Sequence, residues 1–300
     1  MLGSVLADRY EVLGVLGKGA LYVVYRARPL VEHREVAVKR ASLGRYTSES
    51  SRGALADVIV MQALRSPWII ESSAAYLHQT SRILTVEVPI YQFTLTEVRT
   101  LYLRQHGSIS ARVWLRVAHA ILNALVYLHN LSRSAGRFRR PQFLDLVVDL
   151  TSIDVVRGKE IWDQLQGVKQ LCHGDIKPTN VMVNLQEDLL SFQSIVLIDF
   201  TSCSLGDSRA YSPAYSLPGR DRRPPIPMDD IWGLRCTLSE LATGKPDASI
   251  AEVLERLHPQ GREEQQTIAS IMGCIHRLVR KATDGSHDGT EAAASLLRFF

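Results

Sequence analysis

One short segment, His173–Asn180, restricts what this chain can fold into more than any other stretch. It reads His-Gly-Asp-Ile-Lys-Pro-Thr-Asn, and an apolar run that predicts a buried strand leads from it to Asp199. Asp175 can accept a proton from an attacking hydroxyl group, and Lys177 can neutralise charge on a phosphoryl group in transfer. Asn180 and Asp199 carry the oxygen ligands that Mg²⁺ prefers. The spacing is typical of a phosphoryl-transfer site, so the fold must bring this loop and the end of the strand together.

The composition is that of an ordinary folded protein and excludes several classes. The 300 residues are 46% hydrophobic and 22% charged, and the net charge of +4 is too small to indicate nucleic-acid binding. The four cysteines are scattered without a C-x-x-C pair, which predicts neither a disulfide framework nor a zinc site. The apolar runs look too short to span a membrane, and the first residues lack the regions of a signal peptide. We therefore expect an intracellular protein, cytoplasmic or nuclear, with no membrane or nucleic-acid partner.

The predicted elements change from strands to helices along the chain. In chain order, they are three antiparallel strands within residues 9–40, a helix over 51–64, two strands within 74–88, an amphipathic helix over 110–131, a helix over 228–241 and further helices after residue 250. We expect an α+β fold in a single domain over residues 1–300. A β-rich small lobe with one helix would span residues 9–88, and an α-rich large lobe would span residues 89–300.

Two further motifs precede the catalytic segment. Gly17-Lys-Gly19 forms a glycine turn, in which small residues let backbone N–H groups approach phosphates. The strand Val36-Ala-Val-Lys39 follows and ends in a lysine. Together with the segment after His173, these motifs resemble the protein kinase family in order and spacing, from about residue 10 to residue 297. The resemblance implies a bilobal kinase fold that uses ATP and Mg²⁺.

The resemblance also assigns residues to the nucleotide site. It implies nucleotide contacts from Gly17, Gly19, Val24, Ala37, Lys39, Asp57 and Glu87. Tyr22 replaces the third glycine of the phosphate loop, and Asp57 stands where the family has the Glu that holds Lys39. The arm of Asp57 is one methylene shorter, so we expect a pair with Lys39 that is direct if the helix lies closer, or bridged by water. Pro89 has no N–H group, which leaves the carbonyl of Glu87 as the expected hydrogen-bond partner of adenine.

The catalytic roles follow from the same comparison of motifs. It implies that Asp175, Lys177 and Lys39 act in catalysis and that Asn180 and Asp199 bind the metal. Ser212 is expected to hydrogen-bond Asp175 and Lys177. Asp230, at the start of a later helix, is expected to support the backbone of the catalytic loop.

Four further positions depart from the family pattern. Gly174 and Thr201 replace the usual Arg and Gly of their motifs, and Gly219 replaces a Glu at the end of the activation segment. Asp288 stands where the Arg partner of that Glu belongs. Because removal of both members of a buried ion pair can be nearly neutral, we interpret the second change as compensating the first.

An insert at about residues 130–171 separates the long helix from the catalytic segment. We expect it to be a surface excursion that folds back on the helical lobe, in preference to a docking element.

Three functions stay open on the sequence alone. The retained phosphate- and metal-handling side chains favour an active serine/threonine protein kinase that acts on protein substrates. A pseudokinase scaffold or nucleotide-binding regulatory module is the alternative, supported by a short similarity of residues 230–237 to the mitotic-checkpoint Bub kinases and pseudokinases. Phosphotransfer to a small molecule, as in aminoglycoside-type relatives, is disfavoured by Lys177 and by the peptide-binding block that begins at Ser212. The sequence does not predict an oligomeric state.

Overall fold

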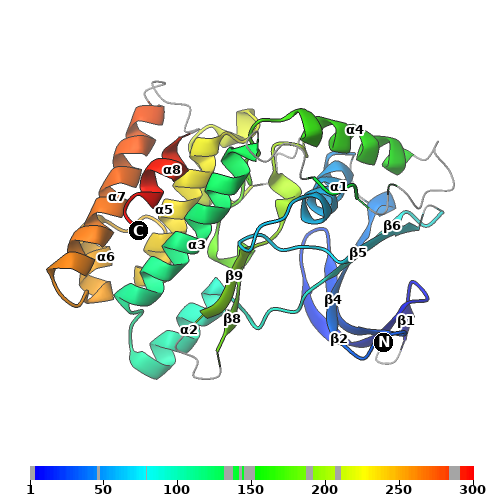
Figure 1. Ribbon diagram of the computed structural model, residues 1–300, viewed down its shortest axis with the longest axis horizontal. Helices are drawn as coiled ribbons and strands as arrows, with labels where there is room; N and C mark the ends of the chain where they lie inside the picture. Colours follow the sequence, from blue (N-terminus) through cyan, green and yellow to red (C-terminus); the bar gives the residue numbers. More distant parts are fainter. Residues whose placement is uncertain are drawn as a thin grey trace.

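The structure is a computed structural model that describes residues 4–45, 48–78, 80–131, 138–141, 144, 153–186, 192–206, 211–283 and 291–300. A small lobe built on a sheet and a large lobe built on helices lie side by side (Figure 1). The bilobal α+β fold expected from the sequence is confirmed. Most of the insert before residue 153, together with Asp288, lies outside the described residues.

The small lobe contains an antiparallel sheet with strand order β1-β2-β3-β4-β6-β5. The strands are β1 (Val5–Leu6), β2 (Tyr10–Lys18), β3 (Val23–Pro29), β4 (Val36–Ser42), β5 (Ala74–His78) and β6 (Ile83–Val88). All but the short β1 were expected from the sequence. Because side chains alternate along a strand, one face buries an apolar cluster that includes Tyr10 and Val38, while Lys39 points to the other face.

The helix of the small lobe, α1 (Ser48–Ala63), covers the second face of the sheet. Every residue from Gly53 to Leu64 is buried. A helix that is apolar on all sides must be covered on all sides. The sheet alone cannot do this, so α1 requires a second partner.

The large lobe is mainly helical and holds a small second sheet of order β7-β8-β9. Its elements are β7 (Phe93–Thr94), α2 (Leu95–His106), α3 (Ala111–His129), β8 (Val181–Leu185), β9 (Phe192–Leu197), α5 (Pro227–Thr243), α6 (Ile250–Leu257), α7 (Arg262–Thr283) and α8 (Ala292–Leu297). The helices expected over 110–131 and 228–241 correspond to α3 and α5, which are joined by a 2.9 Å hydrogen bond from the Trp114 indole to the Leu238 carbonyl. Helix α2 was not predicted, although Thr94 and Glu97 form a capping box at its start.

Helix α3 is the one helix of the described chain that is long and apolar enough to cross a membrane. The sequence reading had considered every apolar run too short. In the structure 61% of the apolar window is buried against the rest of the lobe. Its apolar residues therefore serve the core, where α5 and α8 pack against it (Figure 1).

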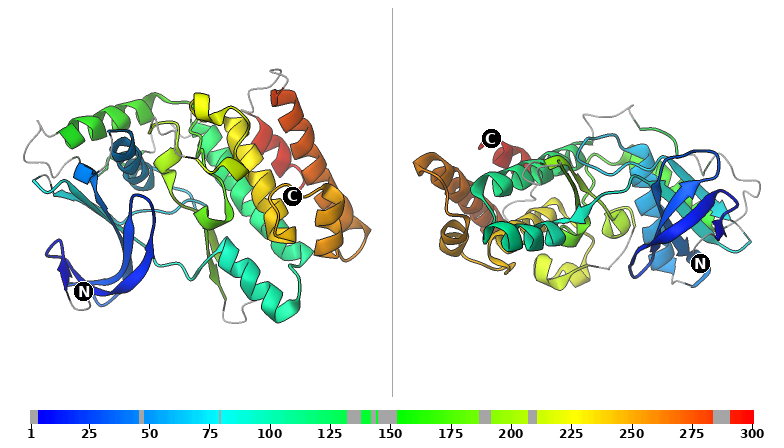
Figure 2. Two further views of the ribbon diagram at one scale, coloured as in Figure 1. Left: turned by 180° about the vertical axis from the view of Figure 1, so that it is seen from behind. Right: turned by 90° about the horizontal axis from the view of Figure 1, so that it is seen from below.

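The described helix of the insert, α4 (Ile153–Gly167), packs against α1 of the small lobe (Figures 1 and 2). The expectation that the insert folds back on the helical lobe was wrong for this part. Its buried side chains, which include Ile161, Trp162 and Leu165, provide the cover that α1 needs.

Candidate active site

The catalytic loop is held in place by the first turn of α5. The carboxylate of Asp230 accepts the backbone N–H groups of His173 and Gly174 at 2.9 and 2.8 Å, and the ring of His129 lies 2.8 Å from the same carboxylate. This is the support expected of Asp230. The side chains of His129, Cys172 and Asp230 come within 4.8 Å of one another. Both Asp230 oxygens already accept hydrogen bonds, so we interpret this cluster as an anchor and not as a metal site.

Glycine is required at position 174 by the backbone around it. Gly174 has φ of +82°, and a Cβ atom added there would lie 2.3 Å from the carbonyl oxygen of Ser202. An L side chain would be strained by the φ angle and would also overlap that carbonyl. The start of the activation segment therefore runs across the position from which an Arg side chain would leave the loop.

Asp175 lies at the centre of a hydrogen-bonded group. Lys177 Nζ donates to Asp175 Oδ2 at 2.5 Å and to Ser212 Oγ at 2.8 Å. The backbone N–H of Ser212 donates to Asp175 Oδ1 at 3.0 Å. The amide nitrogen of Asn180 donates to the backbone carbonyl of Asp175 at 2.9 Å. The sequence predicted the Ser212 contacts, and the structure shows that the contact to Asp175 is made by the backbone N–H.

Lys39 and Asp57 form a direct ion pair, with no water needed. Lys39 Nζ lies 2.6 Å from Asp57 Oδ2, and the Asp57 side chain is fully buried. Asp57 Oδ1 accepts the backbone N–H of Phe200 at 2.8 Å, so one carboxylate joins β4, α1 and the start of the activation segment. The Phe200 ring packs against His173 with centroids 4.8 Å apart. These contacts connect α1 to β4 and, through Phe200, to the catalytic loop.

Tyr22 fills space beside Lys39. Its side chain is 7% exposed, and its ring centroid lies 4.2 Å from Lys39 Nζ, within the range of a cation–π contact. The hydroxyl group donates to the carbonyl of Ala54 on α1 at 3.0 Å. Tyr22 thus turns inward from the glycine turn and packs on the lysine that the sequence assigned to the phosphates.

The remaining residues assigned to the nucleotide site lie around the hairpin and β6. Val24 pairs with Gly17 on one side and with Lys39 on the other, and Gly19 closes the turn through a 2.8 Å backbone bond to Tyr22. Ala37 is buried on β4, opposite Val88 of β6.

Glu87 has a different environment from the one assumed for the hinge. Its carboxylate lies on the sheet face away from Lys39 and accepts hydrogen bonds from Tyr10 at 2.9 Å and from Arg34 and Ser73 at 2.5 Å. Burial raises the pKa of Glu87, but these hydrogen bonds outweigh it and hold the pKa below the ordinary value. Its carbonyl already accepts the backbone N–H of Ser73 at 3.1 Å and the hydroxyl group of the same serine at 3.5 Å.

Asp199 stands at the end of β9 next to the catalytic loop. Its neighbour Ile198 donates its N–H to the carbonyl of Asn180 at 3.0 Å, which brings the two predicted metal ligands side by side. Asp199 has φ of +67°, and Thr201 stabilises this turn with a 2.6 Å hydrogen bond to Asp199 Oδ1. Burial raises the pKa of Asp199, but Lys39 and the Thr201 hydrogen bond lower it below its ordinary value, so the group stays anionic.

The donor set fits a hard divalent cation. Asp199 keeps Oδ2 for a ligand, and Asn180 uses its amide nitrogen for Asp175, which leaves the amide oxygen. Oxygen atoms from a carboxylate and an amide match the preference of Mg²⁺.

Beyond Gly219 the chain buries a charge that the sequence reading did not expect. Arg220 is 1% exposed, bonds the carbonyl of Arg223 at 2.7 Å and lies 4.0 Å from Asp229. Burial lowers the pKa of Arg220. Asp288 lies outside the described residues, so the proposed compensation between Asp288 and Gly219 stays a prediction.

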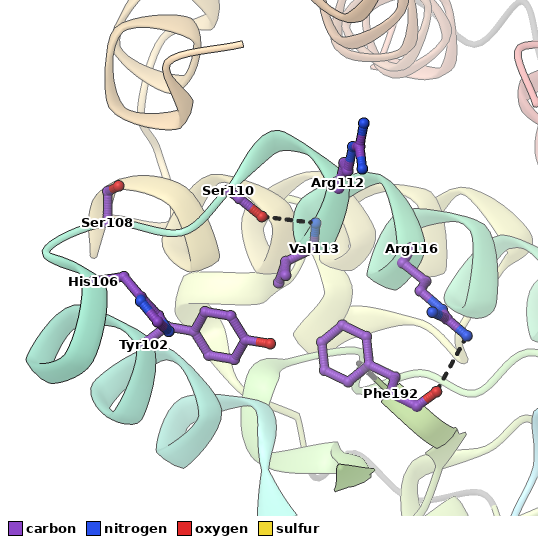
Figure 3. A pocket seen from close by; sticks show the side chains of 8 residues that line it. All are labelled: Tyr102, His106, Ser108, Ser110, Arg112, Val113, Arg116 and Phe192. Atoms are coloured by element: carbon purple, nitrogen blue, oxygen red, sulfur yellow. Dashed lines mark hydrogen bonds between the residues drawn. The ribbon is translucent and has the colours of Figure 1, made fainter. Parts of the chain in front are cut away.

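A cavity of about 480 Å³ lies away from these residues, between α2, α3 and β9 (Figure 3). Arg116 donates to the carbonyl of Phe192 at 3.1 Å on its rim, and Tyr102 and His106 line the α2 side. It contains none of the residues assigned to the site.

Comparisons with known proteins find similarity to protein kinases. A model of the protein kinase domain matches residues 10–133. The serine/threonine-protein kinase Nek3 of Oryza sativa subsp. japonica is 23% identical over 97% of this chain and 43% of its own length. The cell division control protein 2 homolog 3 of Trypanosoma brucei brucei is 21% identical over 83% of the chain and 68% of its own length. PrkC of Bacillus subtilis is 20% identical over 94% of the chain and 38% of its own length.

A solved structure gives the same picture of the fold. The kinase domain of Mycobacterium tuberculosis PknI superposes with a TM-score of 0.61 and 18% identity, covering 100% of this chain and 99% of that one. At this identity the likeness shows the fold. The chain spans between 38% and 68% of the three curated relatives named above.

Proposed function

We propose that this chain, which resembles protein kinases in its fold and its motifs, transfers the γ-phosphoryl group of ATP to serine or threonine hydroxyl groups of proteins. The observation that carries the proposal is the hydrogen-bonded group around Asp175, together with the direct Lys39–Asp57 pair. Catalysis of this reaction depends on positioning and on charge stabilisation, and both sets of contacts are formed.

Each residue has a role that its contacts allow. Asp175 is the group that accepts the proton of the attacking hydroxyl, and the Ser212 N–H and Lys177 hold its carboxylate in place. The charge of Lys177 would also stabilise the transferred group in the transition state. Lys39, held by Asp57, orients the nucleotide phosphates. Asn180 and Asp199 would hold Mg²⁺, which neutralises phosphate charge when bound.

Lys177 favours serine or threonine as the acceptor over tyrosine, as the family pattern implies. The serine/threonine kinases among the relatives support this choice of acceptor. A protein substrate and an intracellular location, cytoplasmic or nuclear, belong to the same proposal.

Radiolabel transfer from [γ-³²P]ATP to a general protein substrate tests the proposal. Asp175→Asn should abolish transfer while leaving Mg-ATP binding within about twofold, because it removes the proton acceptor and not the phosphate contacts. Asp199→Asn should abolish the Mg²⁺-dependent part of nucleotide binding. Absence of transfer in the wild-type chain at several Mg²⁺ and Mn²⁺ concentrations would refute the enzyme proposal.

One observation favours the alternative, a pseudokinase scaffold or nucleotide-binding regulatory module. The Tyr22 ring packs on Lys39, where the phosphates of a nucleotide would be bound. Mg-ATP binding without phosphoryl transfer would support the regulatory module, and no binding at all would support the scaffold.

A further inference from the structure

The position of α1 depends on the helix of the insert. Between Arg52 and Leu64, the polar side chains of α1 are those of Arg52, Asp57 and Gln62, and the rest of this stretch is apolar or glycine. One side of α1 packs on the turn at Phe200 and reaches the sheet through the Asp57–Lys39 pair and the shared apolar cluster. On another side α1 packs against α4, which lies next to it (Figures 1 and 2).

The apolar side of α4 is built for this contact. Val155, Gly158, Ile161, Trp162 and Leu165 recur at helical spacing and are all buried. Exposed polar residues, which include Asp163 and Gln166, occupy the opposite side. Burial of such a face stabilises the contact in proportion to the apolar area removed from water.

Two arginines of the small lobe fasten α4 at its two ends. At the first turn, Arg82 binds both oxygens of Asp154 at 2.7 and 2.8 Å, and the Asp154 side chain is 1% exposed. Arg82 has φ of +52°, an uncommon conformation for a non-glycine residue, which persists where surrounding contacts fix it. This bidentate geometry sets the direction in which α4 leaves the sheet.

At the last turn, Arg52 of α1 connects three segments. Its Nη2 donates to Gln164 of α4 at 2.8 Å, and its Nε donates to the carbonyl of Leu205 in the activation segment at 3.2 Å. Glu160 of α4 lies 3.6 Å from Nη1. A shift of α4 would therefore disturb the Arg52 contacts that connect it to α1 and to the activation segment.

We propose that α4 is a built-in positioning element for the candidate active site. It holds α1 against the sheet, and α1 in turn holds Asp57 in contact with Lys39 and with the N–H of Phe200. The side chain of Asp57 is one methylene shorter than the Glu usual in the family, so its contact with Lys39 at 2.6 Å tolerates little outward movement of α1. The consequence for nucleotide binding rests on the proposed function, whereas the consequence for α1 does not.

The test compares Asp154→Asn with a matched control on the same helix, Asp163→Asn, whose carboxylate is exposed. Hydrogen exchange is measured on the full chain, and Mg-ATP affinity is measured by calorimetry. Asp154→Asn should raise the exchange rate of backbone amides over residues 53–64 at least tenfold, while amides of α3 and α5 stay protected. It should also raise the Kd for Mg-ATP about fivefold or more. Asp163→Asn should change neither quantity.

A double-mutant cycle separates positioning from general stability. If α4 acts through Asp57, Asp154→Asn should raise the Kd for Mg-ATP much less in an Asp57→Asn background than in the wild type, because the contact it supports is already lost. Additive effects on the Kd, or unchanged exchange of the α1 amides, would overturn the proposal. Should Asp154→Asn fail to fold, Gln164→Ala removes the Arg52 contact from an exposed position and is judged by the same two measurements.

The two proposals fail in different ways. A wild-type chain that binds no Mg-ATP contradicts the proposed function, but the exchange of the α1 amides still decides the role of α4. Normal nucleotide binding with no effect of Asp154→Asn contradicts only the role of α4.

Discussion

Replacement of Tyr22 should strengthen nucleotide binding while it weakens the fold. The ring of Tyr22 packs on Lys39 with 4.2 Å between its centroid and Nζ, and its hydroxyl group is tied to the carbonyl of Ala54. A nucleotide whose phosphates bind Lys39 has to displace this ring. In Tyr22→Ala the ring is absent, so that cost disappears from the binding step.

The size of the effect follows from the two contacts. A cation–π contact of this kind contributes about 0.5–2 kcal/mol, and a buried hydrogen bond contributes about 1 kcal/mol. The two contributions sum to about 1.5–3 kcal/mol, and about 1.4 kcal/mol corresponds to a tenfold change in Kd, so Tyr22→Ala should bind Mg-ATP about 12- to 140-fold more tightly. Tyr22→Phe keeps the ring and loses only the hydrogen bond, so it should gain about fivefold at most. Loss of a buried aromatic ring should lower the free energy of unfolding of Tyr22→Ala by about 3 kcal/mol.

Calorimetric titration with Mg-ATP measures the Kd, and thermal unfolding with and without the nucleotide measures stability. Without nucleotide, Tyr22→Ala should have a lower Tm than the wild type. On addition of Mg-ATP, its Tm should rise by more than the Tm of the wild type does. If both variants are folded and bind Mg-ATP no more tightly than the wild type, the ring does not compete with the phosphates and the reasoning is refuted.

Four further outcomes follow from single contacts. Asp57→Glu restores the residue usual in the family, but the longer side chain overpacks a fully buried position. It should therefore lower the free energy of unfolding, measured by chemical denaturation, by about 1–3 kcal/mol. Gly174→Ala should cost more than about 1–2 kcal/mol in the same assay, because φ of +82° and the nearby Ser202 carbonyl exclude a Cβ atom. Glu87 has a lowered pKa, so its contribution to stability is complete above the ordinary carboxyl pKa and is lost as the pH falls through the folded value. Between pH 5 and pH 3 the Tm of the wild type should therefore fall more than that of Glu87→Gln. Thiol labelling of the native chain at pH 7.5 should modify Cys274 first, because the other three cysteines are buried. Burial also raises the pKa values of those three thiols, to about 12 for Cys203 and about 11 for Cys236.

The sequence predicted the fold and the arrangement around the catalytic loop because these depend on local pattern and on motif spacing. Alternation and helical periodicity located the strands and the long helices α3 and α5. The contacts of Asp230 with the loop backbone and the closeness of Ser212 to Lys177 followed from motif positions. Such contacts are set by residues at fixed offsets from an element end, so a linear reading can find them.

Contacts between segments far apart in the sequence could not be predicted from local pattern. Gly174 was read as the loss of an arginine, whereas the structure shows that the Ser202 carbonyl occupies the space of any side chain there. Glu87 was read as a hinge carbonyl, yet its carboxylate belongs to a hydrogen-bonded cluster with Tyr10, Arg34 and Ser73, on strands and loops far apart in the sequence. Nothing in local sequence pattern records these approaches.

One missed contact, between α1 and the insert, did have a signal in the sequence from which it could have been predicted. The run Leu55-Ala-Asp-Val-Ile-Val-Met61 has no polar side on a helix apart from Asp57, and a helix of that kind cannot face water. It therefore required cover from a second element, and the insert contained a helix with one apolar side to provide it. The shorter Asp57 arm belongs to the same adaptation. Because the Asp57 side chain is short, α1 must lie close to Lys39. A second element, α4, is then needed to hold α1 in that position. The insert, the apolar outer side of α1 and the Glu-to-Asp change are on this view parts of one adaptation, which is why Asp57→Glu alone should not improve the site.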